Sequence, residues 1–255
     1  MTQVLYVVWQ DPVDRCWYPV GRLTRGNGGY SFAYTRGSKR SPRFIPFGRM
    51  TDLETVYESR ELFPLFANRL LSKERPEYRD FLNWLNLSET EEDALAQLGR
   101  TGGTRETDSL VLVPCPSPTE TGEYQVKFFA HGLRYLSDTA IQAVNRLTPS
   151  SRLFLMPDPQ NEHDRLAIAL RTGEPKSLVG YCPRYLTGDL HFLLKALNAD
   201  EITIVAERVN QDAPIQLRLL CAVTAMWPEG FQPCSAEDYQ ILAPASRNVS
   251  AGALP

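Results

Sequence analysis

Residues 153–170, LFLMPDPQNEHDRLAIAL, consist of two short apolar segments joined by a polar loop. The apolar segments, 153–156 and 166–170, are each the length of one buried strand, and Pro, Asp and Asn in the loop are turn residues. Working outward, the same reasoning predicts further strands at 124–130, 178–182, 202–209 and 215–224. Ser137 can cap a helix through Leu147, and Pro183 can start one through Leu197. Short strands with helices between them predict a small barrel or curled sheet, a closure that removes exposed edges.

The first third of the chain predicts a separate antiparallel meander covered by helices. Its strands are expected at 4–9, 17–23 and 30–34, and residues 110–113 can form one more. Apolar spacings of three and four predict helices at 61–71, 76–85 and 94–98. The last of these has a capping box at Ser88 and Glu91 and would end at Gly99. The expected fold is α+β with two domains, residues 1–122 and 123–230, followed by a partly flexible tail at 231–255.

Composition narrows the classes of protein that this chain can be. Its 255 residues are 43% hydrophobic, and 27 Lys and Arg stand against 30 Asp and Glu, a net charge of −3. That balance fits a folded domain and excludes a globally basic nucleic-acid coat. The apolar runs are far shorter than the roughly 18 residues of a membrane span, and residues 1–9 lack the features of a signal peptide. Five widely spaced cysteines fit reduced thiols, so we expect a cytoplasmic protein without membrane contact.

Catalytic and metal-binding patterns are missing from the sequence. His131, His163 and His191 are isolated, and no two cysteines have metal-ligand spacing. Walker, dinucleotide and nucleophile-elbow motifs are also absent, so we expect no enzyme activity and no cofactor. One alternative stays open, because Asp158, Glu162 and Asp164 crowd one loop and could hold a divalent cation for hydrolysis. The favoured interpretation is a loop capped by its own Asp and Asn side chains.

Three separated motifs carry a family resemblance. They are His131-Gly132-Leu133-Arg134-Tyr135, then Pro157-Asp158-Pro159-Gln160-Asn161-Glu162-His163-Asp164-Arg165-Leu166-Ala167-Ile168, then Val179-Gly180-Tyr181-Cys182-Pro183-Arg184-Tyr185-Leu186. Their order and content resemble the HIRAN family over about residues 125–226. The resemblance implies a small OB-like β-barrel with two helices that binds the 3′-hydroxyl end of single-stranded DNA.

The resemblance also implies candidate nucleic-acid-binding residues. Recognition of a strand end needs planar groups to stack bases, a carboxylate to accept a hydrogen bond from the hydroxyl, and cations for phosphates. The matching positions are Tyr135, His163 and Tyr181 for stacking, Asp164 for the hydroxyl, Gln160 and Asn161 for a base edge or sugar, and Arg134 and Arg184 for phosphates. The alternative is that Tyr135 and Tyr181 pack the barrel and Asp164 caps a turn.

This sequence departs from the family pattern within the second motif. Glu162 and His163 replace the usual Pro and Tyr, and Glu162 adds negative charge beside a polyanion. Between residues 126 and 228 there are 11 Lys and Arg against 10 Asp and Glu. Because phosphate neutralisation supplies most of the affinity for DNA, we expect modest, strongly salt-dependent binding, with single-stranded DNA favoured as the partner.

A second resemblance covers about residues 4–87. Residues 18–23 (YPVGRL), 30–34 (YSFAY) and 62–71 (LFPLFANRLL) resemble the N-terminal subdomain of HipA kinases. None of the kinase core follows, so the resemblance implies no kinase activity. It implies instead a regulatory or interaction role in a toxin–antitoxin or defence system, with a protein partner bound through residues 1–122.

The first domain also contains a basic segment interleaved with aromatic residues. Residues 15–49 hold eight Lys or Arg and no Asp or Glu, and Tyr18, Tyr30, Phe32 and Tyr34 lie among them. A basic sheet face with aromatic rings can act as a platform for single strands. The alternative is that Tyr30, Phe32 and Tyr34 form core and that the cations lie on a solvated loop. The carboxylates that follow it, Asp52, Glu54, Glu58 and Glu61, can neutralise that loop.

Overall fold

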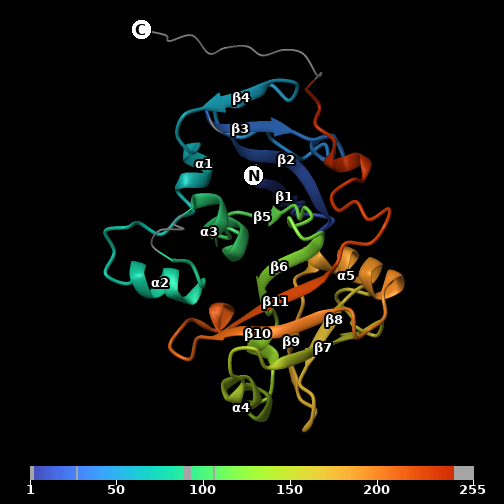
Figure 1. Cartoon of the computed structure of the whole chain (residues 1–255). Coiled ribbons are helices and arrows are strands. Elements are labelled where there is room, and N and C mark those ends of the chain that lie inside the picture. The colour runs from blue at the N-terminus through green and yellow to red at the C-terminus, as the bar shows by residue number, and fades with distance from the viewer. Residues whose placement is uncertain (1–2, 27, 89–92, 106, 244–255) are drawn as a thin grey trace. The chain divides into compact units, whose positions relative to one another are not determined.

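A computed structural model describes residues 3–26, 28–88, 93–105 and 107–243. The chain divides into two compact units that are each assembled from separate stretches (Figure 1). Unit one consists of Met1–Arg75, Glu92–Cys115 and Cys234–Pro255, and unit two of Pro76–Glu91 and Pro116–Pro233. Within the described ranges, no helix combines the length and apolar character that crossing a bilayer requires.

Unit one is built on a five-stranded antiparallel sheet in the order β4-β3-β2-β1-β5. The strands are β1 (Gln3–Gln10), β2 (Trp17–Gly26), β3 (Gly29–Tyr34), β4 (Val56–Ser59) and β5 (Leu110–Pro114). The predicted meander at β1 to β3 is confirmed, but β4 was missed. Strand β5 extends the sheet by pairing with β1, a contact between residues about a hundred positions apart in sequence.

Helices α1 (Pro64–Ala67) and α3 (Ala94–Thr101) belong to this unit. The prediction of a helix over 61–71 is wrong, since only one turn forms. Pro64 begins that turn. Arg69, which follows the turn, has a side chain that is 1% exposed. It donates to Gly103 O at 2.7 Å and pairs with Asp108 at 2.5 Å. The apolar side chains of 62–71 therefore reach the core from an irregular segment.

Helix α3 begins and ends at different residues from those predicted. Asp93 is the N-cap, and its carboxylate accepts a hydrogen bond from Leu95 N at 3.0 Å. Glu91 of the predicted capping box lies outside the described residues. The helix runs past Gly99 to Thr101 and ends at Gly102, whose φ of 70° is the left-handed conformation typical of a helix end. Because α3 packs on β1 and β5, tertiary contacts carry it past Gly99.

The segment 234–243, predicted as part of the tail, is attached to unit one. Ile241 forms a β-bridge with Thr35, and the ring of Tyr239 makes an edge contact with that of Tyr6 at 4.8 Å between centroids. An ion pair also holds this segment, since Arg36 pairs with Glu237 at 2.8 Å. This stretch of the predicted tail is therefore held against unit one, and residues 244–255 lie outside the described part of the chain.

Unit two is built on a six-stranded antiparallel sheet in the order β6-β11-β10-β7-β8-β9. The strands are β6 (Glu123–Phe129), β11 (Leu219–Met226), β10 (Thr203–Val209), β7 (Arg152–Pro157), β8 (Ile168–Arg171) and β9 (Leu178–Tyr181). The sheet curls into a half-barrel, because an isolated bridge joins Tyr181 at the end of β9 to His131, two residues past β6. The predicted strand at 215–224 begins later, since Ile215–Leu217 forms a 3₁₀ turn.

Two predicted helices, α4 (Asp138–Arg146) and α5 (Arg184–Ala196), are present in unit two. Ser137 caps α4 by accepting from Ala140 N at 3.3 Å, as predicted. Helix α2 (Tyr78–Trp84), which we placed in the first domain, groups with this unit, because Asn210 Nδ2 donates to Trp84 O at 3.0 Å. The core holds the inward residues of the strands and one face of α5, including Phe128, Leu153, Ile168, Val179 and Leu190.

Candidate functional site

Strand β7 presents alternate side chains to the core and to solvent. Leu153 and Leu155 point to the core, whereas Phe154 and Met156 are 38% and 43% exposed. On strand β8, Ile168 and Leu170 lie in the core, and the small Ala169 between them is also buried. The solvent side of β7, β8 and β9, called here the outer face, therefore carries the residues in register with Phe154 and Met156.

A β-bulge places Tyr181 on this outer face. The register between β8 and β9 pairs Leu170 with Gly180 but Arg171 with Leu178, so Val179 is one extra residue. In an unbroken strand, Val179 and Tyr181 would share a face, and Val179 is fully buried in the core. The bulge moves Tyr181 to the opposite side, where it pairs with Ala169 and so lies in the row of Met156.

Two glycines permit this local geometry. Gly180 has a φ of 137°, and a Cβ there would lie 3.0 Å from both Ala130 Cβ and His131 O. Gly132 has a φ of 77°, and a Cβ on it would lie 3.2 Å from Cδ2 of Tyr181. The first motif therefore packs against the ring from the third motif.

The Tyr181 hydroxyl connects the third motif to the second. It donates to Asp158 Oδ2 at 3.1 Å, and the same oxygen accepts from Asn161 Nδ2 at 3.3 Å. Burial, followed by the hydrogen bond to the Asp158 carboxylate, raises the pKa of Tyr181. The half-buried Tyr181 ring is thus fixed at its outer end by a carboxylate.

The loop after Asp158 is held by its own side chains. Asn161 Oδ1 accepts from the backbone N–H groups of His163 and Asp164 at 3.0 and 3.1 Å. Asp164 Oδ1 accepts from Leu166 N at 2.9 Å, so Asp164 caps a turn. This confirms the interpretation that the loop is capped by its own Asp and Asn residues. Among the described residues, no group of three or more His, Cys, Asp and Glu side chains could hold a metal ion.

Asp164 also links the loop to helix α5. Its Oδ2 lies 3.4 Å from Nε of Arg184, the first residue of the helix, and the Arg184 side chain is 61% exposed. The structure therefore links four of the eight predicted site residues in one chain of contacts, in which Tyr181 and Asn161 contact Asp158 and Arg184 contacts Asp164. These four are Asn161, Asp164, Tyr181 and Arg184.

The side chains of the other four predicted residues are exposed to solvent. Arg134 and Tyr135 belong to the 3₁₀ turn Leu133–Tyr135, and Tyr135 is 83% exposed, so it does not pack the barrel. Gln160 and His163 are exposed in the loop. In the described part of the chain, the side chains of these four make no hydrogen bond or ion pair.

Sequence reasoning missed the central position of Asp158. The sequence analysis assigns its carboxylate to a loop cap or a cation site, whereas it is the acceptor that joins Tyr181 to Asn161. Period-two alternation from Phe154 through Met156 to Asp158 would have placed it on the outer face.

The aromatic platform proposed for unit one is wrong for two of its rings. Phe32 and Tyr34 are fully buried, and the Tyr34 hydroxyl donates to Met50 O at 2.7 Å. They face the core with Phe66 because alternate residues of β3 share the covered side of the sheet. These rings cannot stack bases.

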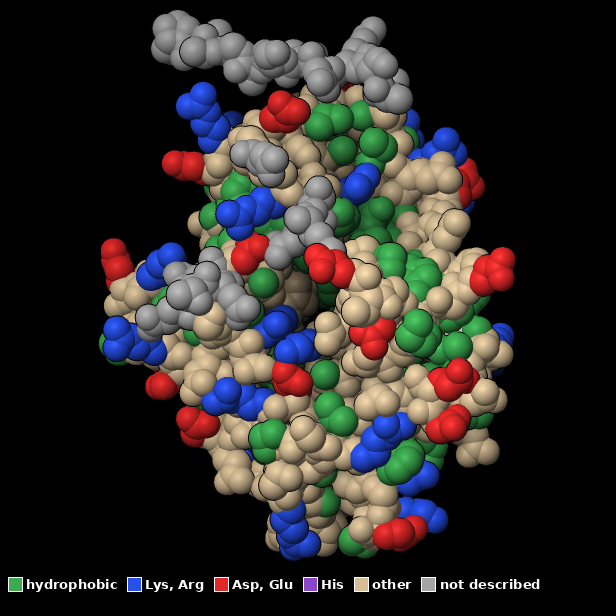
Figure 2. Space-filling model, in the orientation of Figure 1, with side chains coloured by type: hydrophobic (Ala, Val, Ile, Leu, Met, Phe, Trp, Pro, Cys, Tyr) green, Lys and Arg blue, Asp and Glu red, His purple; other side chains and the backbone are tan. Residues whose placement is uncertain are grey.

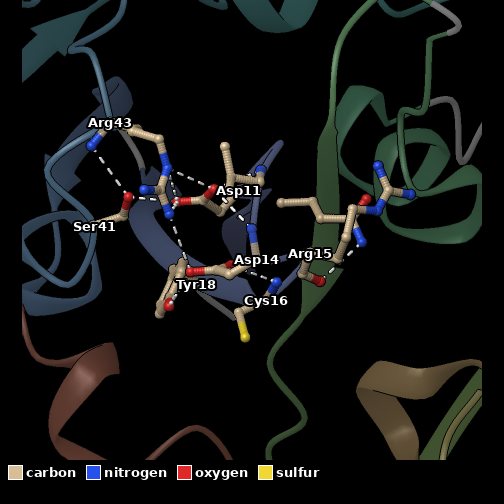
Figure 3. Close-up of polar contacts among 9 residues, drawn as sticks. Asp11, Asp14, Arg15, Cys16, Tyr18, Ser41 and Arg43 are labelled. Carbon is tan, nitrogen blue, oxygen red and sulfur yellow. Dashed lines mark hydrogen bonds and ion pairs between the residues drawn. The ribbon is translucent and has the colours of Figure 1, made fainter.

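Carboxylates also neutralise much of the basic segment. Arg25 pairs with Asp93 and Lys39 with Glu54, at 2.8 and 3.0 Å. Figure 3 shows Arg43 directed at the buried Asp11, 2.8 Å away, where Ser41 also donates to Asp11 at 2.5 Å. On the face drawn in Figure 2, blue and red side chains are interspersed.

Comparisons with known proteins agree with one of the two resemblances. The family model described as the HIRAN domain matches residues 124–227. Among solved structures, a protein from Lactobacillus plantarum is 18% identical over 41% of this chain and 99% of its own, with a TM-score of 0.31. The HIRAN domain of human HLTF is 19% identical over 42% of this chain and 80% of its own, also with a TM-score of 0.31. No curated protein matches the chain. The HipA-like resemblance of the N-terminal region stays a prediction, whereas residues 124–227 are supported as a HIRAN domain.

Proposed function

We propose that this protein binds single-stranded nucleic acid, with DNA favoured, and recognises a free 3′ end at the Asp158–Tyr181 site through an OB-like HIRAN domain. The observation that carries the proposal is the convergence of the three motifs on one outer face. Gly132, Tyr181 and Asp158 come from three separate segments, and Tyr181 joins them, because its ring lies against Gly132 and its hydroxyl donates to Asp158.

Each group has a chemical role in this proposal. Tyr181 and the exposed Tyr135 and His163 offer planar surfaces on which bases can stack. Asp164 uses one oxygen for Leu166 N and faces Arg184 with the other, and each carboxylate oxygen has a second lone pair to accept from a hydroxyl.

A terminal hydroxyl and a terminal phosphate differ sharply at such a site. The carboxylates of Asp158 and Asp164 accept from a hydroxyl but repel a phosphate. The exposed guanidinium group of Arg134 can contact the internal phosphates of the strand, and the exposed guanidinium group of Arg184 can add a phosphate contact beside its ion pair with Asp164. This arrangement favours a 3′-hydroxyl end over a 3′-phosphate end.

Competition binding with two matched oligonucleotides tests the proposal. The full chain is mixed at low salt with a 5′-labelled single strand, and unlabelled strands ending in a 3′-hydroxyl or a 3′-phosphate compete for it. We expect the hydroxyl strand to compete about 10- to 150-fold better, the range of one hydrogen bond to a charged group. Asp164→Asn, which keeps an acceptor for Leu166 N, should remove most of that difference.

Asp138→Asn is the matched control, because Asp138 is an exposed carboxylate on α4 of the same unit. It should keep the preference for the hydroxyl end. Equal competition by both strands would overturn end recognition. Loss of all oligonucleotide binding at low salt, with a protein that co-purifies through residues 1–122, would favour the regulatory role instead.

We further propose that the chain binds strands without cleaving them. The carboxylates of Asp158 and Asp164 are both engaged by donors from the protein itself. Labelled DNA and RNA incubated with the protein and Mg²⁺ should stay intact. Cleavage that Asp164→Asn abolishes would contradict this proposal.

A further inference from the structure

We propose a second nucleic-acid contact on the outer face, a stacking platform formed by Phe154 between Arg152 and Arg171. It would hold a base upstream of the strand end. The inference rests on the proposed function, since it assigns the path of the strand that leaves the Asp158–Tyr181 site.

Position on the sheet is the first argument. Arg152, Phe154 and Met156 alternate along β7, and the next residue in the same alternation is Asp158. Arg171 on β8 pairs directly with Phe154. At roughly 3.3 Å per residue, Phe154 lies about 13 Å along the strand from Asp158. A strand bound at the proposed end site can therefore continue over Met156 to Phe154 without leaving the face.

The chemistry of the three side chains is the second argument. Phe154 is 38% exposed, and the guanidinium carbons of Arg171 and Arg152 lie 4.8 and 5.9 Å from its ring centroid. Bases stack on aromatic rings and on guanidinium planes alike, and the cations also neutralise phosphates. One cluster thus provides both of the contacts that single strands use.

Both cations keep their charge available for a ligand. Arg152 donates to Thr203 Oγ1 and Ile202 O at 2.9 and 2.8 Å, and Arg171 donates to Thr172 O at 2.9 Å. These acceptors are neutral, and within the described ranges no carboxylate lies at ion-pair distance from either guanidinium. Unit one behaves differently, since Arg25, Arg36, Lys39, Arg40 and Arg43 are all paired with Asp or Glu.

The charges along β7 also define a direction. The loop at its far end contains Asp158, Glu162 and Asp164, where a terminal hydroxyl brings no charge. The beginning of the strand carries Arg152, beside Arg171, where internal phosphates bring negative charge. We infer that the strand lies with its 3′ end at the loop and its upstream nucleotides over Phe154.

Phe154→Leu tests the platform, because Leu keeps the apolar volume close to that of Phe and removes the ring. The probe is a 5′-labelled single strand of about 12 nucleotides with a 3′-hydroxyl, within the usual range of site sizes for such folds. We expect binding to weaken about 5- to 150-fold, the range for loss of one stacked base. Arg152→Ala and Arg171→Ala should each reduce the slope of log affinity against log salt by about 0.7. Arg146→Ala, an exposed arginine on α4, is the control and should leave the slope unchanged.

The outcomes separate this inference from the proposed function. If Phe154→Leu binds as tightly as the wild-type chain while the 3′-hydroxyl preference persists, the platform is overturned and the end site stands. If Phe154→Leu weakens the long strand but not one shorter than about 4 nucleotides, the platform is supported. If the wild-type chain binds no strand at low salt, both fail. Circular dichroism of each variant checks that the fold is kept.

Discussion

Gly180→Ala should lower the free energy of unfolding of unit two and change the orientation of the Tyr181 side chain. An alanine Cβ at this position would lie 3.0 Å from Ala130 Cβ and His131 O and 3.1 Å from Leu133 Cδ1. Ala130 and Leu133 are buried in the core, so neither can move aside freely. The φ of 137° adds backbone strain, because a residue with a Cβ rarely adopts it.

These two effects set the magnitude. Backbone strain of this kind costs about 1–3 kcal/mol, and an extra methyl in a packed core costs about the same. We therefore expect the free energy of unfolding to fall by roughly 2–6 kcal/mol, a large share of the usual ~5–15 kcal/mol. Partial relief is possible only if the bulge at Val179 rearranges, which would turn Tyr181 away from Asp158.

Urea denaturation and oligonucleotide competition measure these consequences separately. Gly188→Ala is the matched control, because Gly188 lies within α5 and a Cβ there meets nothing within 4 Å. Alanine is the better helix former, so this variant should gain about 1 kcal/mol. If Gly180→Ala were as stable as wild type, the account of the bulge would be wrong. If it were destabilised but still preferred a 3′-hydroxyl end to the same degree, the bulge would not control the site.

Two carboxylates with shifted pKa values, Asp189 and Asp11, yield predictions of opposite sign. Burial raises the pKa of Asp189 to about 6, and the hydrogen bond from the Tyr124 hydroxyl, 3.3 Å away, lowers it by a smaller amount. The unfolded chain therefore ionises at a lower pH than the folded chain, so stability is lost as pH rises from about 4 through 6. Asp189→Asn should therefore raise the free energy of unfolding by up to about 3 kcal/mol at pH 8 and by little at pH 4. Urea titrations at the two pH values measure this, and an equal gain at both would contradict the reasoning. Arg43 holds the pKa of Asp11 well below its usual range, so ionised Asp11 stabilises unit one at neutral pH and this contribution is lost only as pH falls through that lowered pKa. Asp11→Asn should accordingly lower the melting temperature at pH 7, and an unchanged value in thermal scans would count against the ion pair.

Local sequence patterns were sufficient where the structure is locally determined. The strands β6 to β9 follow apolar segments bounded by turn residues, and α4 begins at the Ser137 cap that its sequence indicates. The three motifs were expected to form one site because of the HIRAN resemblance, whereas local patterns place each of them only at the end of a strand or at the start of a helix.

Contacts between distant segments could not be predicted in the same way. Nothing in the Leu110–Pro114 sequence identifies β1 as its partner, since any antiparallel edge could pair with it. The return of Ile241 to Thr35 likewise depends on residues two hundred positions apart. Buried Arg69 shortened the predicted helix through contacts with Gly103 and Asp108, which no helical periodicity reveals.

The bulge at Val179 shows why the site itself was only half predicted. Period-two alternation assigns Tyr181 to the buried face with Val179, and one inserted residue reverses that assignment for every side chain beyond it. The signal is Gly180, because a glycine within a strand often marks a bulge. The Val179-Gly180-Tyr181 segment thus places an aromatic ring on the solvent side two residues after a buried valine.

Charge pairing decides which basic residues remain available for a polyanion. The segment 15–49 has the densest run of cations in the sequence, yet five of them face carboxylates across unit one. Binding phosphate at those positions would require breaking ion pairs that already exist. Arg152 and Arg171 do not belong to a run of cations in the sequence, but they donate to neutral acceptors beside an exposed ring. A polyanion can therefore pair with both guanidinium groups without displacing a carboxylate. The pair Arg152 and Arg171, although less conspicuous in the sequence than segment 15–49, is the stronger candidate surface.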